Sequence, residues 1–119
     1  MDFFIRKTLF KKVKLKMEME EILDVILHEL EGDLGTQWGT SKDYFEKEVS
    51  PFAEKVSSIC NRKESGEVSL ADSKKEIEKL RPDLNQIVNK AEEVGIVEKG
   101  LIKEKFFLKS MSILTQFLE

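Results

Sequence analysis

One row of side chains has the composition of a metal site. Glu21, Asp24, His28 and Glu31 recur at intervals of three and four residues, which places them on one face of a helix. Helical di-iron proteins instead carry inward-facing Glu-x-x-His motifs on two helices. Here the residue three before His28 is Val25, the chain has one histidine, and the row faces away from the apolar side of its helix. We therefore predict a solvated acidic face and no metal centre.

Cys60 is the one cysteine of the chain, which excludes an internal disulfide and a cysteine-based zinc site. As a nucleophile it would need an activating base, and His28 is the one histidine that could provide it. No local signature of such an enzyme surrounds it. Because unpaired cysteines are among the most buried residue types, we expect Cys60 in the core.

The glycine-containing stretch GDLGTQWGTS, residues 32–41, reads as a loop. It lacks the lysine and the spacing of a phosphate-binding loop, and it follows a helix rather than a strand. Trp38 within it either anchors a partner or covers the end of the bundle, and we favour the second because a loop tryptophan near a bundle end usually finds apolar cover. With no convergent catalytic set, the sequence predicts a protein that is not an enzyme and has no cofactor.

Charge is distributed very unevenly at the start of the chain. Residues 1–16 carry six cations and one acid, a net charge of +5, whereas residues 17–34 carry seven acids and no cation. The basic segment interleaves its cations, among them Lys11, Lys12 and Lys14, with three phenylalanines. We call residues 1–16 the basic arm and expect it to be a separate extension of a single helical domain over residues 17–119.

Two functions compete for the basic arm. Lysines interleaved with phenylalanines suit an anionic membrane surface or the phosphates of nucleic acid. The acidic body of the protein, and 3 arginines against 17 lysines, disfavour nucleic acid. We favour packing of the arm on the acidic residues that follow it, in its own chain or a neighbour's, because they are the nearest counter-charge.

Apolar residues at helical spacing predict an all-α fold. Helices are expected over residues 18–33, 41–62, 69–94 and 98–118, forming an antiparallel bundle of about four helices. The second should begin at a capping box of Thr40 and Asp43, and the third at Ser69 and Asp72, with Gly95 ending the third.

Two prolines fall within the middle helices. Pro51 interrupts neither the heptad seam around it nor its phase, so a kink is favoured over a break. Pro82 lies sixteen residues after the turn at Gly66 and Pro51 fifteen before it, so the two kinks should sit at nearly the same height.

The last helix is unusually apolar, which predicts self-association. Its two stripes comprise Ile102, Phe106, Phe107, Met111, Ile113, Leu114, Phe117 and Leu118. We expect this to be more apolar surface than three short neighbouring helices need to cover, and large exposed apolar patches usually mark interfaces. We expect a homodimer whose contact includes this helix.

Composition supports these assignments. The chain has 119 residues, 40% hydrophobic and 36% charged, which is one domain's worth and too apolar for full disorder. Six glycines and two prolines are few for an all-β fold, and no apolar run approaches a membrane span. With no targeting signal recognised, a cytoplasmic protein is expected. The predicted function is non-catalytic protein–protein contact, with anionic-surface binding by the basic arm as the alternative.

Overall fold

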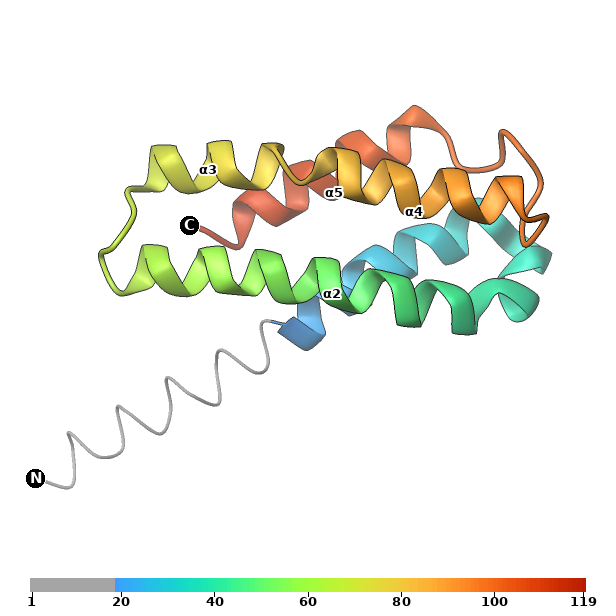
Figure 1. The fold of residues 1–119 in the computed structure, drawn as a ribbon, viewed down its shortest axis with the longest axis horizontal. Helices are drawn as coiled ribbons and strands as arrows, with labels where there is room; N and C mark the ends of the chain where they lie inside the picture. Colours follow the sequence, from blue (N-terminus) through green and yellow to red (C-terminus); the bar gives the residue numbers. More distant parts are fainter. Residues whose placement is uncertain (1–18) are drawn as a thin grey trace, which may run out of the picture.

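The computed structural model describes residues 19–119, which are all-α and contain no strand. Residues 19–34 form a helix that carries most of the acids noted above, and we call it the acidic helix. The chain then reverses direction within the short 3₁₀ turn η1 (Gly35–Gln37) and enters the long helix α2 (Trp38–Glu64) (Figure 1). Predictions that concern the basic arm, including Lys11, Lys12 and Lys14, lie outside the described residues.

The start of α2 differs from the prediction. Gln37 occupies the N-cap position without a side-chain cap, and Thr40 lies inside the helix, where its hydroxyl donates to the Gln37 carbonyl at 3.1 Å. The expected loop over residues 32–41 is shorter than its composition suggested. Gly35 has φ +55°, a left-handed conformation that lets the chain turn within three residues. The capping box of Thr40 and Asp43 is therefore wrong.

Pro51 lies inside α2, which continues through it to Glu64. The alternative of a break and restart at this proline is excluded. All five residues of the predicted heptad seam are buried: Phe45, Val49, Phe52, Val56 and Ile59. Burial of this continuous seam holds the helix together where Pro51 removes one backbone hydrogen bond.

The predicted third helix is two helices, α3 (Leu70–Glu78) and α4 (Arg81–Glu93). Pro82 lies in the first turn of α4. A proline ring clashes with the carbonyl four residues earlier, here that of Glu78, the last residue of α3. Proline therefore bends this side of the bundle at a break, whereas Pro51 leaves α2 unbroken. The predicted cap at the other end of α3 is confirmed, since Ser69 Oγ accepts from the backbone N–H of Asp72 at 3.1 Å.

The last helix, α5 (Glu104–Gln116), begins six residues later than the predicted 98. Gly95 ends α4 with φ +80°, as predicted, and its N–H bonds the Glu92 carbonyl while that of Ile96 bonds the Ala91 carbonyl. A second left-handed glycine, Gly100, keeps the following residues in a loop. Ile102 was expected in a helical stripe, but it lies in this loop and its side chain is buried in the core.

The elements pack side by side around one core (Figure 1). α2 lies against both α3 and α4, and α5 lies against the same two helices. The acidic helix is joined to α5 by an ion pair between Glu29 and Lys109 at 3.2 Å. The core draws on the acidic helix and on α2, α3, α4 and α5, including Ile22, Ile26, Leu30, Phe45, Val56, Ile77, Leu84, Phe106 and Leu114.

Candidate functional site

The apolar residues of α5 that were expected at an interface mostly contact their own chain. Phe106, Phe107, Leu114 and Leu118 are buried, and Met111 is half-buried. α3 and α4 cover the wide stripe together, and the guanidinium of Arg81 lies 5.8 Å from the Phe107 ring centre. The expectation that this surface exceeds what the neighbouring helices cover is therefore wrong. Self-association stays a prediction, and the fully buried members of this set are not available for it.

Trp38 is the first residue of α2 rather than part of a loop. Its ring stacks on buried Phe45 with centroids 6.4 Å apart and 17° between the ring planes. Tyr44 meets the same Phe45 ring edge-on, with centroids 5.1 Å apart. Trp38 is half-buried and packs against the edge of the core, so it covers the core from outside.

The row of Glu21, Asp24, His28 and Glu31 lies on the exposed face of the acidic helix. Within residues 19–119, no three histidine, cysteine, aspartate or glutamate side chains are placed so that they could hold a metal ion. Cys60 is 2% exposed, and the prediction that it lies in the core is confirmed.

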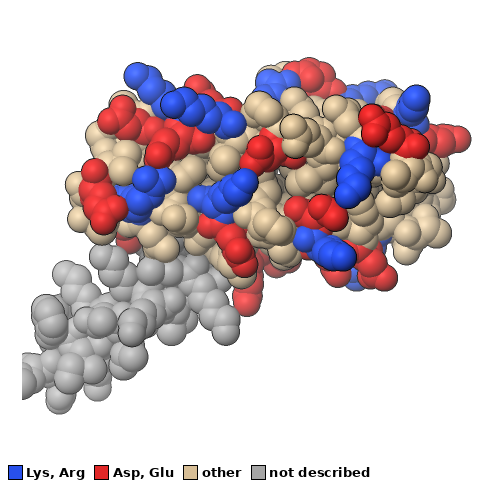
Figure 2. Space-filling model, viewed as in Figure 1, with Lys and Arg blue, Asp and Glu red and all other residues tan. Residues whose placement is uncertain are grey.

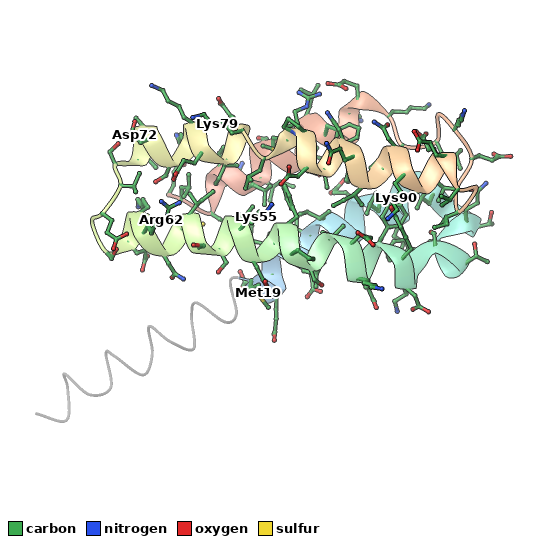
Figure 3. The ribbon with its side chains drawn as sticks, in the orientation of Figure 1. Met19, Lys55, Arg62, Asp72, Lys79 and Lys90 are labelled. Carbon is green, nitrogen blue, oxygen red and sulfur yellow. The ribbon has the colours of Figure 1, made fainter. Side chains whose placement is uncertain are left out.

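A groove runs between α2 and the α3–α4 pair, and ion pairs cross it at heptad spacing. Arg62 of α2 pairs with Glu76 of α3 at 3.1 Å, and Lys55 of α2 pairs with Asp83 of α4 at 2.9 Å. The two pairs are seven residues apart on each side, the spacing of interhelical ion pairs in coiled coils. Figure 3 labels Lys55, Arg62, Lys79 and Lys90 along this groove. Cations and acids alternate over the face that it crosses, with no large area of one sign (Figure 2).

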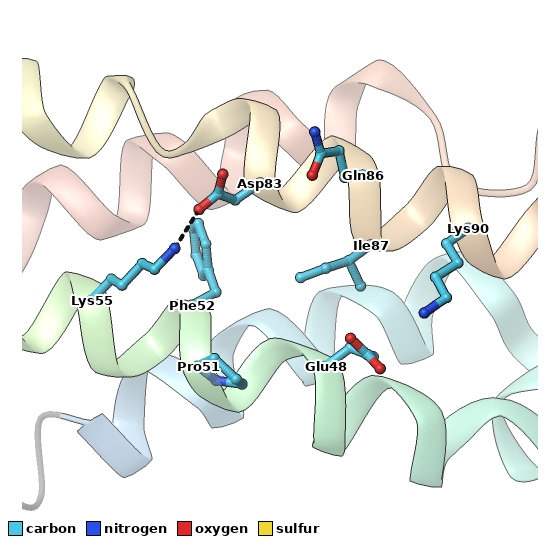
Figure 4. A pocket seen from close by; sticks show the side chains of 8 residues that line it. All are labelled: Glu48, Pro51, Phe52, Lys55, Asp83, Gln86, Ile87 and Lys90. Carbon is cyan, nitrogen blue, oxygen red and sulfur yellow. Dashed lines mark hydrogen bonds and ion pairs between the residues drawn. The ribbon is translucent and has the colours of Figure 1, made fainter.

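The groove contains a hollow of about 310 Å³ beside Pro51 (Figure 4). Each of the two helices contributes four residues at positions i, i+3, i+4 and i+7. They are Glu48, Pro51, Phe52 and Lys55 from α2, and Asp83, Gln86, Ile87 and Lys90 from α4. Because Lys55 pairs with Asp83, the antiparallel register places Pro51 opposite Ile87 and offsets it from Pro82 by about five residues, roughly 7.5 Å along the helix axis. The two prolines are therefore about one and a half turns apart rather than at the equal height predicted.

A second hollow, of about 380 Å³, continues the groove on the other side of Lys55. Residues of α2 and of the segment from α3 to Leu80 line it: Lys55, Ser58, Ile59, Arg62, Glu76, Lys79 and Leu80. Of its charged residues, Arg62, Glu76 and Lys55 are already paired, whereas Lys79 has no ion pair with another described residue. It therefore offers a ligand an unpaired cation but no unpaired anion, whereas the hollow beside Pro51 offers both.

Tyr44 lies one helical turn before Glu48 on α2 and bonds to Ile87, another residue that lines the hollow. Its hydroxyl donates to the Ile87 carbonyl at 2.8 Å. Burial raises the pKa of the Tyr44 phenol, and the negative charge of Glu48 raises it further. The phenol is thus held in its neutral, donating form.

Sequence reasoning missed this groove, although a signal for it existed. Positions 48, 55 and 62 carry Glu, Lys and Arg, and positions 76, 83 and 90 carry Glu, Asp and Lys. Both series flank a predicted apolar seam at heptad spacing, with complementary charges once the helices are antiparallel. Each series taken alone reads as solvated surface.

Comparison with models of known protein families, with curated proteins and with solved structures finds no match for this chain. Over the described residues, no helix combines the length and the apolar character that crossing a membrane requires.

Proposed function

We propose that this is a non-catalytic protein that acts through contact with other protein chains and associates with itself. The observation that supports this proposal is the charge on the acidic helix. Residues 19–34 contain six carboxylates and no lysine or arginine. Of these carboxylates only Glu29 has an ion pair within the described part of the chain, with Lys109.

The position of these carboxylates makes a cationic partner favourable. Glu29, Glu31 and Asp33 fall in the last turns of the acidic helix. The negative end of the helix dipole lies there, so cations stabilise this end and acids destabilise it. Neighbouring like charges repel one another as well. A basic segment laid on this face would relieve both effects.

The basic arm, with its net charge of +5, is the complementary segment in the same sequence. If the basic arm binds the acidic helix of its own chain, it folds back on the helix that follows it. If it binds the acidic helix of a second chain, it joins two copies. On α5, Leu108 is 57% exposed and Met111 half-buried, three residues apart and so on one side of the helix. We propose that Leu108 and Met111 are the residues through which α5 contacts a second copy of the chain.

Sedimentation equilibrium over a range of protein and salt concentrations tests the proposal. We expect the full chain to form a dimer that weakens as salt rises, because exposed charges are screened. Replacing Glu20, Asp24 and Glu31 with Gln, Asn and Gln should weaken the dimer. Replacing Glu54, Glu67 and Glu78 with Gln removes three exposed carboxylates elsewhere in the chain and should not weaken it. A monomer at high micromolar concentration would contradict self-association.

The alternative is that the basic arm binds an anionic membrane or nucleic acid, and the cations and phenylalanines of residues 1–16 favour it. Co-sedimentation with anionic vesicles or DNA, paired with thermal melts, separates the two functions. If a chain beginning at Met17 keeps its melting temperature but loses a salt-sensitive binding, the alternative replaces our first proposal. If deletion lowers the melting temperature and no such binding existed, the arm packs on the protein.

A further inference from the structure

Ion pairs cross the groove between α2 and α3–α4 every seven residues, but at one position of this series the two charged side chains form no ion pair. After Arg62–Glu76 and Lys55–Asp83, the next position brings Glu48 of α2 opposite Lys90 of α4. Their charges are complementary, as in the other two pairs. Yet among the described residues neither Glu48 nor Lys90 has an ion-pair partner.

Glu48 and Lys90, the two residues of this unpaired position, form one end of the 310 Å³ hollow. Glu48 and Lys90 extend into it from opposite walls, while the Lys55–Asp83 pair closes the other end (Figure 4). Phe52, which is 2% exposed, lines the hollow together with Pro51 and Ile87. The hollow therefore offers one unpaired anion, one unpaired cation and an apolar surface between them.

We propose that this hollow binds a small zwitterion, namely a free α-amino acid with an apolar side chain. The ammonium of the ligand would donate to the Glu48 carboxylate, and the Lys90 ammonium would donate to the ligand carboxylate. Charge-assisted hydrogen bonds of this kind are about twice as strong as neutral ones. The apolar side chain of the ligand would lie against Phe52 and Ile87, and no covalent step is involved.

Size and charge together select this class of ligand. At about 310 Å³ the hollow is at the lower end of the roughly 300–1,000 Å³ typical of ligand pockets, which suits a single small molecule. Lys55 and Asp83 neutralise each other, so they favour neither an anion nor a cation. Selection for a molecule with both charges therefore depends on Glu48 and Lys90.

Isothermal titration calorimetry at neutral pH on the full, unaltered chain tests the charge requirement. The three probes are L-leucine, its amide, which lacks the carboxylate, and N-acetyl-L-leucine, which lacks the ammonium. We expect leucine to bind about tenfold more tightly than either analogue, because each analogue leaves one charged wall unpaired. Equal binding of the three probes, or no binding of leucine at millimolar concentration, would overturn the proposal.

Two substitutions then locate the site. Glu48→Gln and Lys90→Met should each reduce leucine affinity about tenfold, since each removes one charge-assisted contact. Glu54→Gln on α2 and Lys75→Met on α3 are matched controls, because both residues are exposed and neither lines the hollow. Circular dichroism checks that each variant is folded. Leucine affinity that survives both Glu48→Gln and Lys90→Met would place binding elsewhere and refute this site.

Discussion

Two other aromatic side chains of α2, Trp38 and Tyr44, contact the ring of Phe45. Trp38 stacks on one part of its ring and Tyr44 approaches it edge-on, while Phe45 itself is 0% exposed. Aromatic pairs of this kind add to the free energy already gained by burial. Replacing Phe45 therefore removes both the buried ring and the surface on which its two neighbours rest.

We expect Phe45→Ala to lower the free energy of unfolding by about 3–5 kcal/mol, the usual cost of emptying a buried phenylalanine site. Val94→Ala is the control, because Val94 is exposed and should change stability by no more than about 0.5 kcal/mol. Urea unfolding followed by circular dichroism measures both. Equal effects of the two substitutions would contradict the packing described for Phe45.

Tyr44 is the one tyrosine of the chain, so phenolate absorbance on alkaline titration reports this residue alone. We expect its pKa above the usual 10.0, because burial and the charge of Glu48 both disfavour the phenolate. Glu48→Gln should lower that pKa part of the way, since burial is the larger cause. Glu54→Gln should leave it unchanged. An ordinary Tyr44 pKa in the unaltered folded chain would contradict the buried position.

The same titration has a consequence for stability. The unfolded chain loses the phenolic proton near pH 10.0, whereas the folded chain keeps it to higher pH. The folded state therefore binds more protons in that range, and the free energy of unfolding falls as pH rises through it. Tyr44→Phe should abolish this part of the pH dependence, while losing about 1 kcal/mol at neutral pH with the hydrogen bond to Ile87. Urea unfolding at a series of pH values measures both effects.

Among the elements, the caps provide the sharpest test of how the helices begin. Ser69→Ala should cost about 1 kcal/mol, because the Ser69 hydroxyl accepts a hydrogen bond from the Asp72 N–H at the start of α3. Thr40→Ala should be near neutral, because Thr40 lies within α2 and caps nothing. Urea unfolding of both variants measures the two changes in the free energy of unfolding. A larger loss for Thr40→Ala would restore the capping box predicted from the sequence.

Two glycines should respond to alanine with opposite signs. Gly95 has φ +80° at the end of α4, where an L-residue is strained by about 1–2 kcal/mol. Gly39 lies in the first turn of α2 with open space around it and no positive φ, so Gly39→Ala should stabilise by about 0.5 kcal/mol. Thermal melts of both variants give the signs. Stabilisation by Gly95→Ala would contradict the C-cap geometry.

Several structural elements could be predicted from the sequence, and others could not. The all-α fold and the α2 seam follow from heptad periodicity, and Ser69 and Gly95 act as predicted. The start of α5 was misplaced because Ile102, in a loop held by Gly100, fits the helical spacing of the residues after it. The groove was missed because its charges pair only across the register of two helices, which a single chain's periodicity does not reveal.

For the whole molecule, the distribution of charge matters more than its total. The net charge is −3, yet residues 1–16 carry +5 and the acidic helix alone six carboxylates. Raising salt should therefore weaken contacts of the acidic helix while affecting the core little, because buried apolar contacts are not screened. The salt series proposed for self-association measures this directly.

The reversal at Gly35 lets the acidic helix pack on the core of its own chain. Residues 19–64 are helical except for the three residues of η1, so a small change in that turn could join the acidic helix and α2 into one continuous rod. Gly35→Ala disfavours the φ of +55° on which the reversal depends. The acidic helix could then no longer reach the core of its own chain, but it could occupy the same place in a second copy. Short hinges of this kind favour exchange of whole segments between protomers. We expect Gly35→Ala to yield a dimer that dissociates slowly and resists salt, recognisable by size-exclusion chromatography with light scattering.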